Sequence, residues 1–161
     1  MAIALVYLMM IAAAPPAVPR HCGVLCRLAD QVPAKMPEIS GTPPEHMEVA
    51  FADYAACLTG ALEKSAISAQ SSREEIDGAL QAVDDGCVAV GAAATGAFSK
   101  IVVDSGSRNT PDEIARFADY VRAMIGAGML MPVLAKKVGA AGSKEYAEMA
   151  KAAAASLMAR K

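Results

Sequence analysis

The chain has 161 residues and a formal net charge of −2, and 55% of its residues are apolar while only 4% are aromatic. This length allows one domain with a genuine hydrophobic core, and the net charge gives no sign of the concentrated basic surface that a nucleic-acid partner requires, so we predict no nucleic-acid partner. Because the apolar residues are mostly Ala, followed by Val, Leu and Met, the composition favours helices over strands.

The first 14 residues form an uncharged apolar run that ends in small residues before two prolines. This pattern is typical of a secretory signal, and the run is shorter than the roughly 20 residues that cross a bilayer. No Lys or Arg precedes the run, and cleavage after Ala14 leaves a proline first, so Ala13 and Ala17 are alternative cleavage positions. We predict a signal peptide over residues 1–17 and an exported mature protein, periplasmic or extracellular. A retained membrane anchor and a cytosolic core helix are the alternatives.

A Pro-rich arm is predicted over residues 18–41, because seven of the nine prolines lie between residues 15 and 44. These prolines leave room for only a short helix, around residues 22–31. All four cysteines follow the signal, and an even number of cysteines in an exported chain predicts two disulfides. The cysteines are Cys22, Cys26, Cys57 and Cys87.

Two pairings of these cysteines are considered. In an antiparallel helical hairpin that turns near residues 69–70, Cys57 and Cys87 are staggered along the axis by roughly 7 Å, and a direct bond needs Cα atoms within about 7 Å. Cys22 and Cys26 are one helical turn apart, roughly 6 Å, which nearly matches that stagger. We therefore favour an arm helix that staples both hairpin helices, one cysteine to each. In the alternative, the two arm cysteines bond each other and Cys57 bonds Cys87.

Three helix starts in the predicted bundle domain, residues 42–161, carry the capping-box pattern Ser/Thr-x-x-Glu. They are residues 42–45, 72–75 and 110–113. Behind each box the apolar residues recur at steps of three and four, which places each set on one helix face. The first set is Met47, Phe51, Tyr54, Leu58 and Leu62; the second is Ile76, Leu80, Val83, Cys87, Val90, Ala94, Ala97 and Ile101; the third is Ile114, Phe117, Val121, Met124 and Gly128.

A fourth helix is predicted over residues 144–158, after a glycine-containing stretch at residues 139–142. Pro132 predicts that the third helix kinks or ends near Met131. No segment alternates with period two for long enough to predict a strand. The predicted fold is therefore an all-α four-helix bundle.

The two halves of this bundle share short sequences. Phe-Ala-Asp-Tyr occurs at residues 51–54 and again at residues 117–120, and a second helix in each half opens with Ser, a basic residue and Glu, at residues 72–74 and 143–145. Two helical hairpins of similar plan explain these matches. Chance similarity between Ala-rich helices is the alternative.

One group of residues resembles a metal site. His21, Cys22 and Cys26 offer an imidazole and two thiols within six residues, a donor set suited to a soft metal ion. The later cysteines stand alone, and in an oxidising compartment paired thiols become disulfides before they become ligands. We favour structural disulfides and predict no metal and no cofactor. His46 is predicted to be a surface side chain, and none of the common catalytic motifs is present, so we predict no catalytic residue.

Two uncharged apolar runs, residues 86–99 and 123–135, are too short to cross a bilayer and are predicted to be buried core helices. The second run contains Met124, Met129 and Met131. Their flexible apolar side chains suit a partner-binding surface, and filling gaps in the core is the alternative.

The sequence thus predicts a non-enzymatic exported helical protein with a structural or protein-binding role, whose partner is an unknown protein or envelope component. An acidic stretch, residues 38–85, and a basic tail, residues 132–161, are expected to attract each other within the fold or across a homo-oligomer, unless both are solvated helix faces. A metal-handling or redox protein that uses His21 and its neighbouring cysteines is the first alternative. A peripheral membrane protein with an uncleaved N-terminus is the second.

Overall fold

The structure is a computed structural model that describes residues 21–30, 39 and 44–158. Within this part of the chain the regular structure is helical and contains no strand, so the predicted all-α class is confirmed. The helices are α1 (Gly23–Asp30), α2 (Pro44–Lys64), α3 (Arg73–Gly86), α4 (Val88–Asp104) and α5 (Pro111–Met158). The predicted signal peptide, the predicted cap at Thr42 and the side chain of His46 lie outside the described residues.

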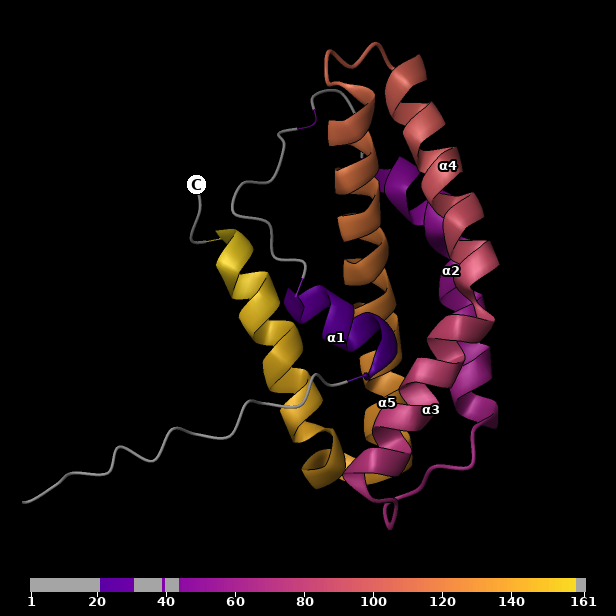
Figure 1. Ribbon diagram of the computed structural model, residues 1–161, viewed down its shortest axis with the longest axis vertical. Helices are drawn as coiled ribbons and strands as arrows, with labels where there is room; N and C mark the ends of the chain where they lie inside the picture. Colours follow the sequence, from indigo (N-terminus) through magenta and orange to yellow (C-terminus); the bar gives the residue numbers. More distant parts are fainter. Residues whose placement is uncertain (1–20, 31–38, 40–43, 159–161) are drawn as a thin grey trace, which may run out of the picture.

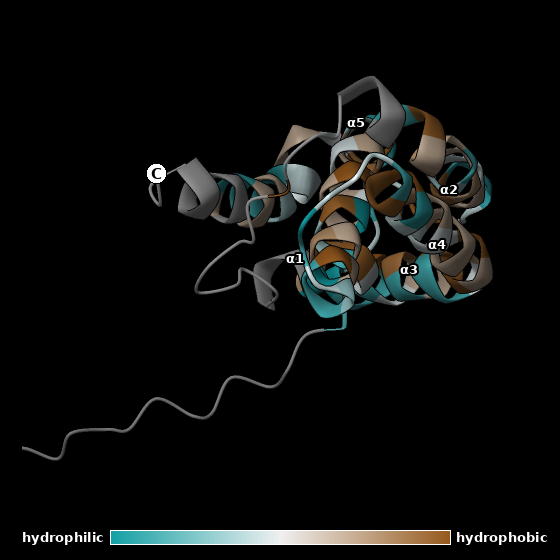
Figure 2. Ribbon diagram, turned by 90° about the horizontal axis from the view of Figure 1, so that it is seen from above, coloured by the Kyte–Doolittle hydropathy of each residue, from teal (hydrophilic) through white to brown (hydrophobic). Residues whose placement is uncertain are grey.

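The described helices pack around one core. In Figure 1, α2, α4 and the first part of α5 lie side by side, α3 continues below α4, and α1 lies across α3 and α5. Seen from above, apolar residues face the spaces between neighbouring helices (Figure 2). The largest fully buried side chains come from all of these helices: Val24, Leu25, Phe51, Tyr54, Leu58, Leu62, Leu80, Phe98, Leu130, Leu134 and Tyr146.

Three phenylalanines join α2, α4 and α5. The ring of Phe98 lies 5.7 Å from that of Phe51 and 5.9 Å from that of Phe117, measured between centroids. Tilted ring pairs at such distances contribute stability beyond the area that they bury. Phe51 and Phe117 are the first residues of the two Phe-Ala-Asp-Tyr sequences, so the two copies lie against the same ring of α4.

Two of the predicted capping boxes are present. At the start of α3, the backbone N–H of Glu75 donates to Ser72 Oγ (3.2 Å) and that of Ser72 donates to the Glu75 carboxylate (2.6 Å). At the start of α5, Glu113 and Thr110 exchange the same bonds at 3.3 and 2.8 Å. The bond from the Thr110 N–H lowers the pKa of Glu113, because it favours the charged carboxylate. Each box satisfies donors that a bare helix start leaves unpaired.

The second predicted helix is two helices. It breaks at Cys87, whose N–H donates to Asp84 O (3.0 Å) while its own carbonyl accepts the N–H of Gly91, and α3 and α4 meet there at 55°. The predicted apolar face is correct up to Cys87. Beyond Cys87 only Ala94 of the predicted residues is buried, because the bend changes which side of the helix faces the core. The buried residues of α4 are Gly91, Ala94, Phe98 and Val102; the predicted Val90 and Ile101 are only partly buried and Ala97 is exposed.

The predicted third and fourth helices are joined in α5. The helix does not end near Met131 but continues through the exposed Pro132. The non-helical residue is Gly139, at φ 75° and ψ 173°, a conformation that glycine adopts without steric cost. After Gly139 the chain reverses direction, and its last helical turns run beside α1 (Figure 1). Ser143, predicted to open the fourth helix, lies inside α5 and donates to the Gly139 carbonyl (2.9 Å).

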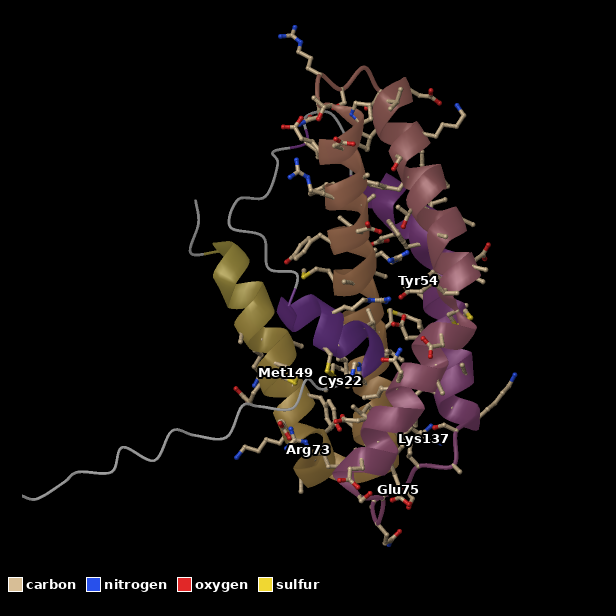
Figure 3. The ribbon with its side chains drawn as sticks, viewed as in Figure 1. Cys22, Tyr54, Arg73, Glu75, Lys137 and Met149 are labelled. Carbon is tan, nitrogen blue, oxygen red and sulfur yellow. A yellow bond between two sulfur atoms is a disulfide. The ribbon has the colours of Figure 1, made fainter. Side chains whose placement is uncertain are left out.

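Polar contacts join the first half of the chain to the basic tail, and two of them involve charged side chains of the tail. Lys137 Nζ donates to the carbonyls of Glu63 (2.9 Å) and Ser65 (2.8 Å) at the end of α2 (Figure 3). A cation at this position complements the negative end of the helix dipole. Arg73 pairs with Glu145 at 2.7 Å. Here the acidic stretch supplies the cation and the basic tail supplies the anion, the reverse of what the charge distribution predicts. Neither contact pairs an acidic side chain of residues 38–85 with a basic side chain of the tail, so the expected attraction between the two stretches stays a prediction.

Candidate functional site

The cysteines pair within the arm and within the hairpin. Cys57 is bonded to Cys87 with Cα atoms 5.9 Å apart, and Cys22 to Cys26 with Cα atoms 5.1 Å apart. The favoured cross-stapled pairing is wrong. Residues 65–72 do not form a tight turn; they run beyond the end of α2 before α3 begins (Figure 1), which cancels the stagger between the hairpin cysteines. In addition, α1 lies on α3 and α5 rather than across α2 and α3.

The two thiols considered as metal ligands, Cys22 and Cys26, form a disulfide with each other, as the favoured interpretation of structural disulfides expected. Cys22 is 0% exposed and Cys26 is 7% exposed, whereas His21 is exposed. A sulfur in a disulfide is not the thiolate that binds a metal ion. Among the described residues, no three His, Cys, Asp or Glu side chains are grouped so that they could hold a metal ion.

A buried polar cluster anchors α1 to α3. Arg27 donates to the carboxylate of Asp84 at 2.6 Å, and the hydroxyl of Tyr54 lies 3.5 Å from the same oxygen. The side chain of Asp84 is 5% exposed, so Arg27 supplies the charge partner that a buried carboxylate needs. Beside them the N–H of Gly23 donates to Gln81 at 3.1 Å. Sequence reasoning missed Asp84, although it lies four residues after Leu80 on the apolar face of α3.

Gly23 is required where α1 meets α3. Its φ is +58°, and a Cβ at this position would lie 2.5 Å from the carbonyl oxygen of Leu80. Any other residue would meet both an unfavourable backbone conformation and a clash with backbone. The close approach places Val24 and Leu25 in the core, so α1 is an integral part of the packing.

The environment of Tyr54 makes stability depend on alkaline pH. Burial raises the pKa of Tyr54 above 10.0, and the negative charge of Asp84 raises it further. A raised pKa stabilises the fold below the ordinary pKa of tyrosine, and this stability is lost as the pH rises, because the unfolded chain ionises first. We expect the free energy of unfolding to fall more steeply than in a Tyr54→Phe variant as the pH rises above about 10, the ordinary pKa of tyrosine. Urea unfolding across this range measures both slopes, and equal slopes would contradict the assignment.

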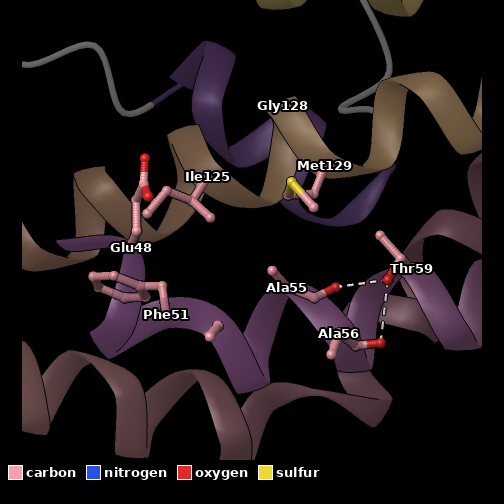
Figure 4. Close-up of a pocket in the computed structure, with 9 residues that line it drawn as sticks. Glu48, Phe51, Ala55, Ala56, Thr59, Ile125, Gly128 and Met129 are labelled. Atoms are coloured by element: carbon pink, nitrogen blue, oxygen red, sulfur yellow. Dashed lines mark hydrogen bonds between the residues drawn. The ribbon is translucent and has the colours of Figure 1, made fainter. Parts of the chain in front are cut away.

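An open apolar groove lies between α2 and α5. Its volume is about 670 Å³, and side chains of the two helices face each other across it (Figure 4). The lining residues are Glu48, Phe51, Ala52, Ala55, Ala56, Thr59, Ile125, Gly128 and Met129. The hydroxyl of Thr59 donates to the carbonyls of Ala55 (2.9 Å) and Ala56 (3.3 Å), so it has no free donor for a ligand. Glu48 is the one ionisable group among the lining residues.

The groove contains one of the three predicted methionines. Met129 lines it and is 47% exposed. Met124 and Met131 are partly buried and pack against the core instead, as the alternative interpretation expected. The α2 side of the groove was not predicted, because alanines at helical spacing look the same whether they face the core, another helix or solvent.

Comparisons with known proteins leave these surfaces without a precedent. No family model, no curated protein and no solved structure matches the chain. Within the described residues, the stretch Pro111–Ala152 of α5 is long and apolar enough to cross a membrane, and the bent pair of α3 and α4 passes the same test if it counts as one span. Core helices of soluble proteins share these properties, and α5 contributes Leu130 and Leu134 to the core.

Proposed function

We propose that this protein is a non-enzymatic, exported helical binding protein that holds an apolar helix of a protein partner in the groove between α2 and α5. The observation that carries the proposal is the groove itself, where apolar side chains of two helices line an open surface with a single carboxylate, Glu48. The buried polar groups Asp84 and Tyr54, with the partly exposed Arg27, hold α1 in place. The two disulfides fit an oxidising compartment and support export.

The shape of the groove suits a helix. Its α2 side is lined once per turn from Glu48 to Thr59, which at 1.5 Å per residue gives a length of roughly 16 Å, or three helical turns. Small side chains such as Ala52, Ala56 and Gly128 allow a guest helix to approach to the roughly 8–10 Å between axes that close packing requires. Met129 supplies a flexible apolar contact, as in other grooves that receive amphipathic helices.

A designed helical peptide tests this proposal. The probe is a fluorescein-labelled peptide of three to four turns, with Ala and Leu on one face and Lys on the other, and fluorescence anisotropy measures its binding. We expect Met129→Glu and Ala56→Glu each to weaken binding at least tenfold, because a charge placed in the contact must be desolvated without a partner.

Val103→Glu provides the matched control. Val103 is 59% exposed on α4 and does not line the groove, so the same charge there should leave peptide binding unchanged. Far-UV circular dichroism confirms that each variant keeps its helices. Binding that is the same for Met129→Glu, Val103→Glu and the parent chain would overturn the proposal.

A further inference from the structure

We infer that the guest helix is supplied by a second copy of this chain, whose residues 151–161 occupy the groove. This inference rests on the proposed function, since it names the partner of the same groove. Three independent features lead to it: the sequence of the tail, the charge at one end of the groove, and the place of the last turns of α5.

The sequence of the tail matches the lining of the groove. Residues 152–155 are four alanines, which complement a groove walled by Ala52, Ala56 and Gly128. Leu157 and Met158 follow and supply the larger apolar side chains of such a guest. Close packing between helices depends on small residues where the axes cross and larger ones beside them.

The charges also match. Glu48 is the ionisable group of the groove lining and lies at one end of it (Figure 4), and Asp53 is exposed further along α2. The tail carries Arg160 and Lys161 directly after its apolar part. Lys151, at the other end of the tail, already pairs with Glu148 at 3.1 Å, so we place Arg160 and Lys161 next to Glu48.

This direction is the favourable one for helix dipoles. Both α2 and the first part of α5 run from the upper to the lower end of the molecule in Figure 1, and Glu48 lies near the start of α2. A guest with its basic C-terminal end at Glu48 runs antiparallel to both helices. Its helix dipole then points opposite to theirs, which is the favourable arrangement for neighbouring helices. As a helix, residues 151–161 measure about 15 Å, close to the length of the groove.

The arrangement of the fold makes the guest a second copy. In Figure 1 the part of α5 that follows Gly139 lies on the side of the molecule away from α2, beyond α1. The residues after Met158 span about 10 Å at most, too short to bring the tail round to its own groove. If two copies exchange tails, both grooves are filled and the dimer buries twice the area of a single tail in its groove. Specific interfaces bury roughly 1,200–2,000 Å².

The oligomeric state tests the inference. Light scattering after size-exclusion chromatography, at chain concentrations from about 1 to 500 µM, should show a monomer that converts to a dimer. We expect Glu48→Lys, and separately the double variant Arg160→Glu with Lys161→Glu, to raise the dissociation constant at least tenfold. All three changes in one chain should restore most of the dimer, because the ion pairs are then reversed rather than lost. Circular dichroism checks that each variant keeps its helices.

A labelled peptide of residues 149–161 separates failure of this inference from failure of the proposed function. Binding of this peptide to the parent chain, weakened by Met129→Glu, supports the inference. A parent chain that stays monomeric and binds the designed Ala-Leu-Lys helix but not the tail peptide overturns the inference and leaves the proposed function intact. If neither peptide binds, both fall. A dimer that is indifferent to the charge reversals also overturns the inference.

Discussion

Val83→Asp is expected to abolish the cooperative thermal unfolding of this protein at room temperature and above. Val83 is 5% exposed in α3, and a carboxylate there has no partner among the apolar side chains of the core. Burying an unpaired charge costs several kcal/mol, which is comparable with the roughly 5–15 kcal/mol of total stability in a domain of this kind. Leu58→Asp in α2, where the native side chain is 0% exposed, should act in the same way.

Ala82→Asp is the control, because Ala82 is the neighbour of Val83 in the same helix and is exposed. It introduces the same side chain with the same helix propensity, so its melting temperature should stay within a few degrees of the parent value. Circular dichroism during heating measures all of these variants. If the Val83→Asp variant had the same melting temperature as the Ala82→Asp variant, the core face of α3 would be assigned incorrectly.

Removal of the Cys57–Cys87 bond should have the second-largest effect. This bond joins residues 30 apart in sequence, and the chain-entropy estimate for a loop of that length is about 3.6 kcal/mol. The bond also holds α2 against the junction of α3 and α4. We expect the double variant Cys57→Ser with Cys87→Ser to lose about 3–4 kcal/mol in urea unfolding.

The double variant Cys22→Ser with Cys26→Ser provides the comparison. Its bond closes a separation of only four residues, for which the same estimate gives about 2 kcal/mol at most. Non-reducing peptide mapping of the parent chain identifies the pairs directly. A fragment that links an arm cysteine to Cys57 or Cys87 would contradict the pairing, and equal losses in both double variants would contradict the entropic explanation.

Local chemistry was sufficient to predict several elements of the fold. Ser72 and Thr110 begin their helices as their capping boxes predict, because a cap depends on residues within one turn of it. Phe51, Tyr54, Leu58 and Leu62 are buried as their spacing predicts. In these cases the residues that fix the structure are close together in sequence.

Other features depend on contacts between distant residues. Nothing near Cys87 distinguishes a continuous apolar face from two helices that meet at an angle, because Val and Ala occupy both sides of α4. The predicted pairing assumed that α2 and α3 are joined by a turn near residues 69–70. The pairing in the structure depends on the actual path of residues 65–72, which the sequence does not reveal. The spacing of Asp84 does not indicate whether it is buried, and its burial depends on the ion pair with Arg27, which reaches it from α1.

The candidate site was predicted only in part. Methionines are conspicuous in a sequence, and one of the three chosen, Met129, lines the groove. The alanines opposite it carry no signal of their own, since a groove is a property of two helices and the space between them. Its location therefore follows from the angle and separation of α2 and α5, which the spacing of residues within either helix does not determine.

The left-handed residue in α5 divides that helix into separate cooperative units. At Gly139 the backbone leaves the helical conformation, so we expect that residues on either side do not have to open together. Tyr146 fastens the second unit to α3 through a 2.6 Å bond to Asp77. In native-state hydrogen exchange, amides of residues 144–152 should therefore exchange as one group, at a lower opening free energy than amides of residues 118–134.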